Sequence, residues 1–421
     1  MRSSLVNLSR HPFYSYLDMR FFISFAFTFF TVFAFGQINS LVYEYSFNNC
    51  NGIESFGGQP GVIFGIGDCE CGVDGFALNF NSPAQFAQFP RDVGNVLGDD
   101  FTFSFYMKPQ NNNVGTNAID IWTIGNECNS DTIFQVRYFP NNGEMRVRFA
   151  DQALNSAEVS GILTGDHCWS YIVITKEANN FSLYIDNDLA GRTNIFEQNS
   201  FTPTSELSLS LGPCDGQPFI SPYQGLIDEL RVYSTALSQG DIIRENYFPN
   251  QIIEEDVVIF KGESVFLETG GICTDDFSWS PETGLDAIDV VEPLASPEET
   301  TIYTLTVNDG SCQSVDQINV VVVDLEELDC SDLLLPSAFT PNGDGKNDVF
   351  GISNSFIVDE LLTFEVFDKW GGRMFYATEN VPTWDGRFRN DFVMPGPYVF
   401  RVRYLCQGEE IQKNGVVNVI R

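Results

Sequence analysis

Many short stretches of the chain alternate between hydrophobic and polar or small side chains with a period of two. In Phe101–Lys108 the odd-numbered positions are Phe or Met, and in Tyr398–Tyr404 the even-numbered positions are aromatic or Val. Successive side chains of a β-strand point to opposite faces, so this alternation is typical of half-buried strands. The pattern recurs along most of the sequence and predicts an all-β protein.

Residues 41 to about 250 contain enough of these stretches for one large sandwich. We expect roughly ten to fourteen strands, more than an immunoglobulin-like domain holds, and therefore a two-sheet jelly roll. One short helix is expected at Ser238–Tyr247, after the last strand. The clearest expected strands are Leu41–Phe47, Phe76–Phe80, Phe101–Lys108, Ile119–Ile124, Ile133–Phe139, Met145–Phe149, Trp169–Lys176, Phe181–Ile185, Glu206–Leu211 and Gly225–Tyr233.

Two smaller β-modules are expected after the jelly roll. An acidic linker at Gln251–Asp256 leads into a segment of about seventy residues, which should form a sandwich around Trp279. The last module has Gly- and Pro-containing turns between its strands and predicts a small antiparallel sandwich whose final strand ends with the chain. The expected strands of the two modules are Ser264–Glu268, Phe277–Ser280, Thr301–Val307 and Gln317–Val323, then Thr363–Asp368, Tyr398–Tyr404 and Val416–Ile420.

The N-terminal segment has the pattern of an export signal. Met19-Arg20 is followed by the apolar run Phe21–Phe35 and by small residues ahead of Gln37. This predicts a signal peptide at residues 1–36, cleaved between Gly36 and Gln37, with Met19 as an alternative start. A membrane anchor is the other interpretation, but the run is shorter than the ~20 residues that a bilayer span needs.

The charge of the protein excludes some partners. The 421 residues carry a formal net charge of −35, and the acids are unevenly distributed. Residues 37–251 hold 25 acids and 9 bases, residues 252–329 hold 19 and 1, and residues 330–421 hold 12 and 9. So acidic a protein repels nucleic acid and anionic lipid. It suits an extracellular protein, whether the charge serves solubility alone or also attracts divalent cations.

Export into an oxidising compartment explains the ten cysteines. Even numbers of cysteines in each module predict disulfides within modules. The pairing of the first six, between Cys50 and Cys214, stays open, whereas in the middle module we expect a bridge between two loops. The cysteines expected to pair in the two smaller modules are Cys273 with Cys312, and Cys330 with Cys406.

One loop of the last module has the spacing of a calcium ligand set. Asn342, Asp344 and Asp348 place oxygen-bearing side chains at alternate or nearby positions, from which they can converge on one ion. No bidentate Glu ends the loop, so it does not match a helix–loop–helix calcium site. A plain Asn-Gly and Asp-Gly turn is the alternative, and Ca²⁺ is the only cofactor that the sequence suggests.

The sequence offers little for catalysis. Glycoside hydrolysis needs two carboxyl groups about 5–10 Å apart, and the Glu-x-Asp-x-Glu strand pattern is absent. Asp228 and Glu229 are adjacent and should point to opposite faces, as a structural pair at a strand end. His167 is the single histidine after the signal segment, so a nucleophile with a His base is not expected. We therefore expect no enzyme activity.

Aromatic side chains are the candidates for stacking on a sugar ring. Trp122, Tyr138 and Tyr223 are possible on loops, but each is also a natural core residue. We expect each of them in the core, and none is a candidate site residue.

The last ninety or so residues resemble a known family. Its motifs are Phe339–Asp348, Trp370-Gly371, Trp384-Asp385-Gly386, Pro395–Tyr398 and Val416–Arg421. As a set they resemble the gliding-motility-associated C-terminal domain, the type B sorting domain of substrates of the type IX secretion system. The resemblance implies export across the outer membrane by that machinery, followed by attachment to the cell surface or release.

The two preceding modules also resemble known families. The first is similar to laminin-G-like, concanavalin-A-like jelly rolls, which implies a carbohydrate- or protein-binding surface in many relatives and glycoside hydrolysis in some. The second resembles the PKD or immunoglobulin-like repeats of bacterial surface proteins, which implies a spacer. The segments carrying these resemblances are Phe103–Lys108, Trp169–Thr175, Leu183–Gly191 and Gly225–Ile243, then Trp279–Leu285 and Ala295–Val307.

The sequence therefore predicts a secreted or cell-surface protein with three β-domains at residues 37–251, 252–326 and 327–421. Its expected function is adhesion, with a glycan or a surface protein bound by the jelly roll. A carbohydrate-active enzyme, such as an O-glycosyl hydrolase, or its accessory module is the second hypothesis. A purely structural matrix protein is the third.

Overall fold

A computed structural model describes residues 40–420 apart from short internal gaps. Met1–Asn39 form a separate unit, so the expected signal peptide and its cleavage site at Gly36 and Gln37 lie outside the described residues. No described helix is long and apolar enough to cross a membrane. The gaps are residues 67–68, 99, 111–117, 126–131, 153–154, 166–167, 195–200, 202–204, 211–219, 311, 325–328, 343–346 and 379–381.

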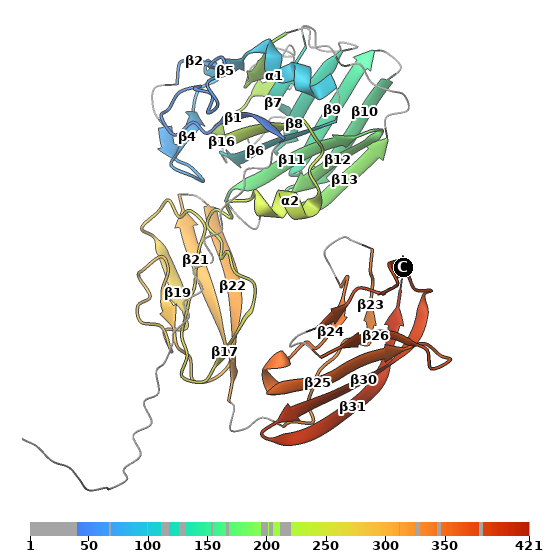
Figure 1. Cartoon of the computed structure of the whole chain (residues 1–421). Coiled ribbons are helices and arrows are strands. Elements are labelled where there is room, and N and C mark those ends of the chain that lie inside the picture. Colours follow the sequence, from blue (N-terminus) through green and yellow to red (C-terminus); the bar gives the residue numbers. More distant parts are fainter. Residues whose placement is uncertain are drawn as a thin grey trace, which may run out of the picture. The chain divides into compact units, whose positions relative to one another are not determined.

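The first module is a sandwich of two sheets, as the sequence predicts (Figure 1). Each described sheet has eight strands, so the two together exceed the ten to fourteen expected in total. The first sheet has the strand order β13-β12-β11-β6-β16-β4-β3, and β1 pairs with β16. Its strands are β1 Leu41–Tyr45, β3 Cys69–Cys71, β4 Phe76–Phe80, β6 Phe101–Pro109, β11 Ser170–Glu177, β12 Asn180–Ile185, β13 Asp188–Asn194 and β16 Gly225–Tyr233.

The second sheet has the strand order β10-β9-β8-β7-β14-β5-β2, and β15 pairs with β7. Its strands are β2 Val62–Phe64, β5 Phe86–Phe89, β7 Ala118–Ile124, β8 Ile133–Phe139, β9 Glu144–Gln152, β10 Asn155–Ile162, β14 Leu207–Leu209 and β15 Ile220–Pro222.

Aromatic side chains fill the space between the two sheets. Phe103 and Phe105 of β6 point inward, as their alternation predicts, and both rings lie within 6 Å of the Trp122 ring on β7. Edge-to-face and tilted contacts of this kind stabilise a core beyond the area they bury. The sandwich is therefore held by interdigitated inner faces, which leaves the outer faces of both sheets for other roles.

Two short helices complete the first module. The expected helix at its end is α2, Gln239–Arg244, which Ser238 caps by accepting a hydrogen bond from the Asp241 N–H. Helix α1, Arg91–Asn95, and the following 3₁₀ turn, η1 Val96–Gly98, were not predicted from the sequence. Helices this short contain too few residues to show a helical period.

The middle module packs a four-stranded sheet, β17-β22-β21-β19, beside the two-stranded sheet β18-β20. Trp279 is 2% exposed and lies in its core, as expected. Strand β22 begins five residues earlier than the sequence predicts, at Cys312 rather than Gln317. The strands are β17 Val257–Phe260, β18 Val265–Phe266, β19 Phe277–Ser280, β20 Leu294–Ala295, β21 Thr301–Asp309 and β22 Cys312–Val323.

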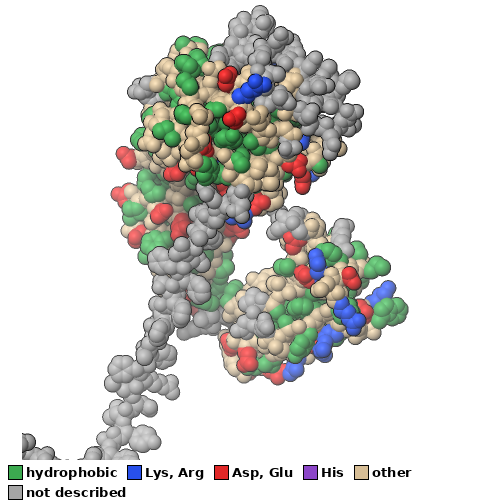
Figure 2. All heavy atoms as spheres, turned by 45° about the horizontal axis from the view of Figure 1, so that its top comes forward, with side chains coloured by type: hydrophobic (Ala, Val, Ile, Leu, Met, Phe, Trp, Pro, Cys, Tyr) green, Lys and Arg blue, Asp and Glu red, His purple; other side chains and the backbone are tan. Residues whose placement is uncertain are grey.

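The C-terminal module is built on the sheet β23-β31-β30-β25-β26. It is not purely antiparallel, because β23 pairs in parallel with the last strand, β31, and leaves it inside the sheet. Lys and Arg side chains are interleaved with hydrophobic ones on this module in Figure 2. Its elements are β23 Ala338–Phe339, β24 Phe350–Gly351, η3 Ser355–Ile357, β25 Glu360–Phe367, β26 Arg373–Ala377, β27 Thr383–Trp384, β28 Arg387–Phe388, β29 Asp391–Phe392, β30 Gly396–Cys406 and β31 Glu409–Val419.

The disulfides correct one prediction. Cys273 and Cys312 are not joined to each other; each forms a bridge to a cysteine of the jelly roll. The rule that even counts pair within modules fails here because loops of the middle module contact the jelly roll and bring cysteines of both modules together. The disulfides among the described cysteines are Cys50–Cys69, Cys71–Cys273, Cys168–Cys312 and Cys330–Cys406.

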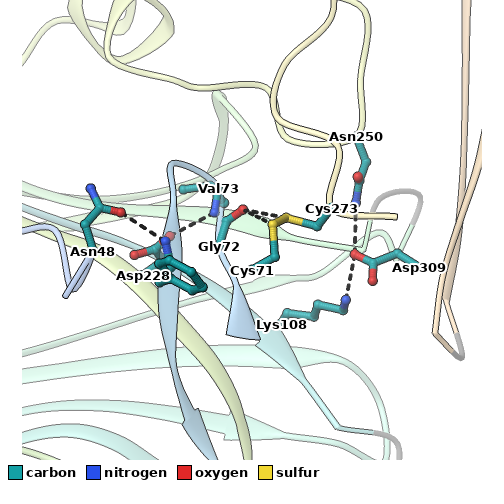
Figure 3. The surroundings of a disulfide bond; sticks show 10 residues. Asn48, Cys71, Gly72, Val73, Lys108, Asp228, Asn250, Cys273 and Asp309 are labelled. Carbon is teal, nitrogen blue, oxygen red and sulfur yellow. Dashed lines mark hydrogen bonds and ion pairs between the residues drawn. A yellow bond between two sulfur atoms is a disulfide. The ribbon is translucent and has the colours of Figure 1, made fainter. Parts of the chain in front are cut away.

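Polar contacts surround the Cys71–Cys273 bridge (Figure 3). The Lys108 ammonium lies 2.7 Å from a carboxylate oxygen of Asp309, at the end of β21. The Asn250 side-chain amide donates to the same carboxylate over 3.3 Å. The middle module is therefore joined to the end of the first sheet by two disulfides and by these polar contacts, in addition to the continuous chain.

Candidate functional site

The outer face of the first sheet carries a buried group of charges on β16. Arg231 is 9% exposed at its side chain and lies 2.9 Å from Glu44, 2.9 Å from Glu229 and 3.5 Å from Glu245. It also donates to the hydroxyl of Tyr247. These partners come from β1, β16 and the segment after α2, and both Glu229 oxygens have no hydrogen-bond partner among the described residues although Arg231 lies at ion-pair distance.

Burial perturbs both carboxyl groups of the adjacent pair. It raises the pKa of Glu229 to about 8, with Arg231 opposing the shift and Glu44 adding to it. Burial, followed by the charge of Glu229, raises the pKa of Asp228 well above its ordinary value. One arginine shared by three carboxylates leaves an excess of negative charge, which favours a proton on the least solvated carboxyl.

Asp228 and Glu229 form a structural pair, although they lie within a strand and not at its end. Asp228 is 0% exposed, and its Oδ2 accepts a hydrogen bond of 2.8 Å from the Val73 N–H, which Figure 3 shows. Glu229 is 1% exposed. Neither carboxyl group has the solvent access that a catalytic acid or base needs.

The outer face of the second sheet presents two rows of polar side chains across neighbouring strands. We call this surface the polar face. The pairing register places the members of each row side by side, about 4.8 Å apart from strand to strand. The first row is Gln88, Ser208, Thr123, Gln135, Arg148 and Glu158, and the second is Asp120, Arg137, Arg146 and Ser160.

The centre of the polar face contains polar atoms without partners. Asp120 and Arg137 form an ion pair of 2.7 Å between Oδ1 and Nε. Asp120 Oδ2, Arg137 Nη2 and Thr123 Oγ1 are buried and have no hydrogen-bond partner among the described residues. An unpaired buried polar group costs about 1–3 kcal/mol, so three on adjacent strands need an explanation.

An irregularity in β7 creates this arrangement. The register between β7 and β8 shifts between Asp120 and Trp122, so that Ile121 and Trp122 both contribute to the core. A β-bulge of this kind reorients the side chains that follow it. Asp120 and Thr123 therefore both face outward, although residues three positions apart in a regular strand point to opposite faces.

The two edges of the polar face differ in chemistry. At one edge the rings of Phe64 and Phe86 stack with centroids 4.3 Å apart, and Phe64 is 40% exposed. At the other edge Arg146 lies 2.9 Å from Glu144 and over the Phe139 ring at 4.6 Å. Arg148, in the same strand, has no ion-pair partner among the described residues.

The aromatic residues suggested by the sequence do not form this surface. Trp122 and Tyr223 are 0% exposed and belong to the core. Tyr138 packs partly against the core, and burial raises the pKa of its hydroxyl. Nothing in the sequence indicates which strands are neighbours. The surface formed by Phe64, Phe86 and the Asp120–Arg137 pair is therefore not predicted from it.

The expected calcium loop is only partly described. Asp344 lies outside the described residues, and the Asn342 N–H donates to Asp348 Oδ1 over 2.9 Å. Among the described residues no three His, Cys, Asp or Glu side chains are grouped to hold a metal ion. Calcium binding at Asn342, Asp344 and Asp348 therefore stays a prediction.

Two family models match the chain. Residues 81–243 match the concanavalin A-like lectin/glucanases superfamily, and residues 333–419 match the type IX secretion signal domain. Both matches fall inside the domains expected from the sequence, whose boundaries, like the PKD assignment, stay predictions. A comparison with curated proteins finds no match.

Solved structures with similar folds include carbohydrate-related proteins of low identity. Domain 4 of AbnA, a GH43 extracellular arabinanase from Geobacillus stearothermophilus solved with arabinotriose, is 21% identical, with 48% of this chain and 96% of that chain covered and a TM-score of 0.37. The CBM40 of the Ruminococcus gnavus IT-sialidase is 14% identical, with 35% and 82% covered and a TM-score of 0.30. Trypanosoma rangeli sialidase in complex with sialic acid is 16% identical, with 49% and 32% covered and a TM-score of 0.38.

The matches and the fold agree on the organisation of the molecule. The jelly roll is of the concanavalin A-like type, and the terminal module directs the chain across the outer membrane. The protein is therefore a type IX secretion substrate that carries a concanavalin A-like domain and a C-terminal type IX secretion signal domain.

Proposed function

We propose that the jelly roll binds a glycan on its polar face and that the exported protein acts in adhesion at or beyond the cell surface. The observation that carries this proposal is the group of three unpartnered polar atoms of Asp120, Arg137 and Thr123. They occupy adjacent positions on β7 and β8, on the outer side of the second sheet, where Asp120 and Thr123 are 1% and 2% exposed and a ligand must displace their cover to reach them.

The chemistry of these atoms suits a saccharide. A sugar hydroxyl both donates and accepts hydrogen bonds, so neighbouring hydroxyls can donate to the Asp120 carboxylate and accept from the Arg137 guanidinium. The hydroxyl of Thr123 can take either role. Phe86 lies two strands from β7 and Phe64 three, about 10–14 Å away, and the pair offers an apolar ring to a second sugar unit.

Binding without turnover is part of this proposal. A glycosidase places two carboxyl groups on either side of the scissile bond. On the polar face Asp120 is paired with Arg137, and the other carboxylates, Glu144 and Glu158, contact Arg146 at the edge. Incubation with a broad polysaccharide panel should release no reducing sugar; release that stops in Asp120→Asn would contradict the proposal.

The test is a glycan array probed with the full secreted protein, comparing the wild type with Arg137→Gln. This change removes Nη2 and the ion pair, and signal for the preferred glycan should fall at least tenfold. The matched control is Arg192→Gln on β13 of the first sheet, where Arg192 contacts Ser182 over 3.1 Å. Equal binding by both variants and the wild type would overturn the proposal.

A parallel array in EDTA separates the polar face from the predicted calcium loop. The loop at residues 342–348 belongs to the secretion signal domain, so removal of Ca²⁺ should leave glycan binding unchanged. Loss of binding in EDTA, restored by Ca²⁺, would place the glycan site at a metal and not on the polar face.

A further inference from the structure

Two large apolar side chains of the secretion signal domain are almost fully exposed. Among the large hydrophobic residues that the structure describes, Trp370 and Met394 are the most exposed, at 83% and 82%. Single exposed apolar residues are ordinary, whereas several large ones gathered on one surface of a domain indicate an interaction site.

The strand register brings these residues to one end of the sheet. Trp370 follows the end of β25 by three residues, and Met394 precedes the start of β30 by two. At that end Val399 pairs with Val416, and their side chains are 45% and 52% exposed. Ile420, just after β31, is 50% exposed. We call Trp370, Met394, Val399, Val416 and Ile420 the apolar end.

The turn that carries Trp370 is held in place. Asp368 Oδ1 accepts hydrogen bonds from the N–H groups of Trp370, at 2.9 Å, and Gly372, at 2.7 Å. Gly371 has a φ of +82°, a conformation that favours glycine. The indole is therefore presented on an ordered turn, and less backbone entropy is lost when a partner binds it.

Positive charge borders the apolar end. The Lys369 ammonium lies 5.3 Å from the Trp370 ring, and the Arg401 guanidinium, which is ion-paired with Glu365, lies 5.5 Å from the ring of Phe367. Residues 330–421 hold 9 of the 22 Lys and Arg residues of the chain, against 12 of its 57 acids. A partner that fits this surface has an apolar pocket with acidic groups on its rim.

We propose that the apolar end is the part of the secretion signal that a component of the type IX apparatus binds, with the Trp370 indole in an apolar pocket and Lys369 against an acidic rim. The inference rests on the family match of residues 333–419 to a secretion signal. Buried tryptophans near the centre of an interface commonly supply a large share of binding energy.

The test measures export of the full chain from the producing bacterium, as the ratio of extracellular to periplasmic protein. In the double variant Trp370→Ala/Met394→Ala this ratio should fall at least tenfold. The matched control is Leu334→Ala/Tyr376→Ala, which truncates side chains that are 58% and 49% exposed in the same domain but outside the apolar end. The control should be exported like the wild type.

Two further variants separate the possible failures. Lys369→Glu changes an exposed turn residue without touching the core, so reduced export would support the proposal even if the double variant were unstable. Deletion of residues 333–419 tests the secretion signal itself. Normal export of that deletion would refute the signal assignment, whereas blocked export of the deletion with normal export of the double variant and of Lys369→Glu would refute the apolar end alone.

Self-association is the competing use of the same surface. Sedimentation of the purified protein distinguishes the two. A wild-type dimer that dissociates in the double variant, while export stays normal, would assign the apolar end to a second copy of the chain and overturn the proposal.

Discussion

The outer faces of the two jelly-roll sheets each contain a carboxylate–arginine pair, but the number of partners of the arginine differs between them. On the first sheet Arg231 contacts three carboxylates and a tyrosine hydroxyl, supplied by β1, β16 and the segment after α2. On the second sheet Arg137 contacts Asp120 alone among the described residues, and each partner keeps an unpaired atom. Both Glu229 oxygens on the first sheet likewise have no hydrogen-bond partner among the described residues, although Arg231 lies at ion-pair distance. The comparison sets an arginine that several protein groups surround against an arginine that has a single partner.

The largest expected effect is on the first sheet. Arg231→Ala leaves the Glu44 and Glu245 carboxylates without a counter-charge and removes the partner of the Glu229 carboxyl, which should lower the free energy of unfolding by about 3–5 kcal/mol. Urea unfolding followed by tryptophan fluorescence measures this. The same substitution at Arg137, whose side chain is 21% exposed, should cost less, because it leaves a single buried carboxylate, Asp120, without a counter-charge. Equal losses at both positions would remove the distinction between the two faces.

The pH dependence of stability should also come from the first sheet. Folding raises the pKa of Glu229 from its ordinary value of 4.5 to about 8, so the folded state holds this proton to higher pH than the unfolded chain does. The free energy of unfolding should therefore fall as the pH rises from about 5 to about 8, by at most about 1.4 kcal/mol per pH unit for one proton.

Urea unfolding at several pH values tests this, with Glu229→Gln as the variant that cannot titrate. The variant should have a shallower slope over the same range. An unchanged slope would mean that Glu229 is not the titrating group.

A smaller effect is expected from substitutions of two buried threonines, one on each sheet. Thr102 on β6 donates to the Thr235 carbonyl and accepts from the Leu237 N–H, both over 2.8 Å. Thr102→Val should lower the free energy of unfolding by about 1–3 kcal/mol, because two buried backbone groups lose their partner.

Thr123→Val on the polar face should instead leave stability unchanged or raise it by up to about 1 kcal/mol, because an unpaired buried hydroxyl is removed. It should at the same time weaken glycan binding about three- to tenfold. Thermal unfolding and titration calorimetry measure the two quantities. A destabilised Thr123→Val variant would show that its hydroxyl has a structural role.

Local alternation was enough to predict much of the fold. The run at Phe101–Lys108 and the run at Tyr398–Tyr404 both form strands with the expected residues in the core, because each pattern is read within one strand. Only Tyr398–Tyr404 is half-buried as expected, since Phe101–Met107 is buried on both faces. Trp279 was placed in its core for the same reason. Strand positions and their core-facing side chains can be predicted from segments of about ten residues, because a strand has a side-chain period of two.

The site and the disulfides depend on contacts that no local pattern records. Cys71 and Cys273 are separated by 202 residues, and their pairing follows only from how the modules meet. The bulge between Asp120 and Trp122 breaks the alternation of β7, so the sequence hides which of its polar residues face outward. Strand neighbours such as β2 and β5, which bring Phe64 and Phe86 together, are equally invisible before folding.

The account is tested most directly by a crystal structure of the protein with its best-binding glycan from the array. We predict ligand oxygens within about 2.7–3.2 Å of Asp120 Oδ2, Arg137 Nη2 and Thr123 Oγ1. A glycan bound to the first sheet, or to the loop at residues 342–348, with these three atoms untouched, would contradict the central claim.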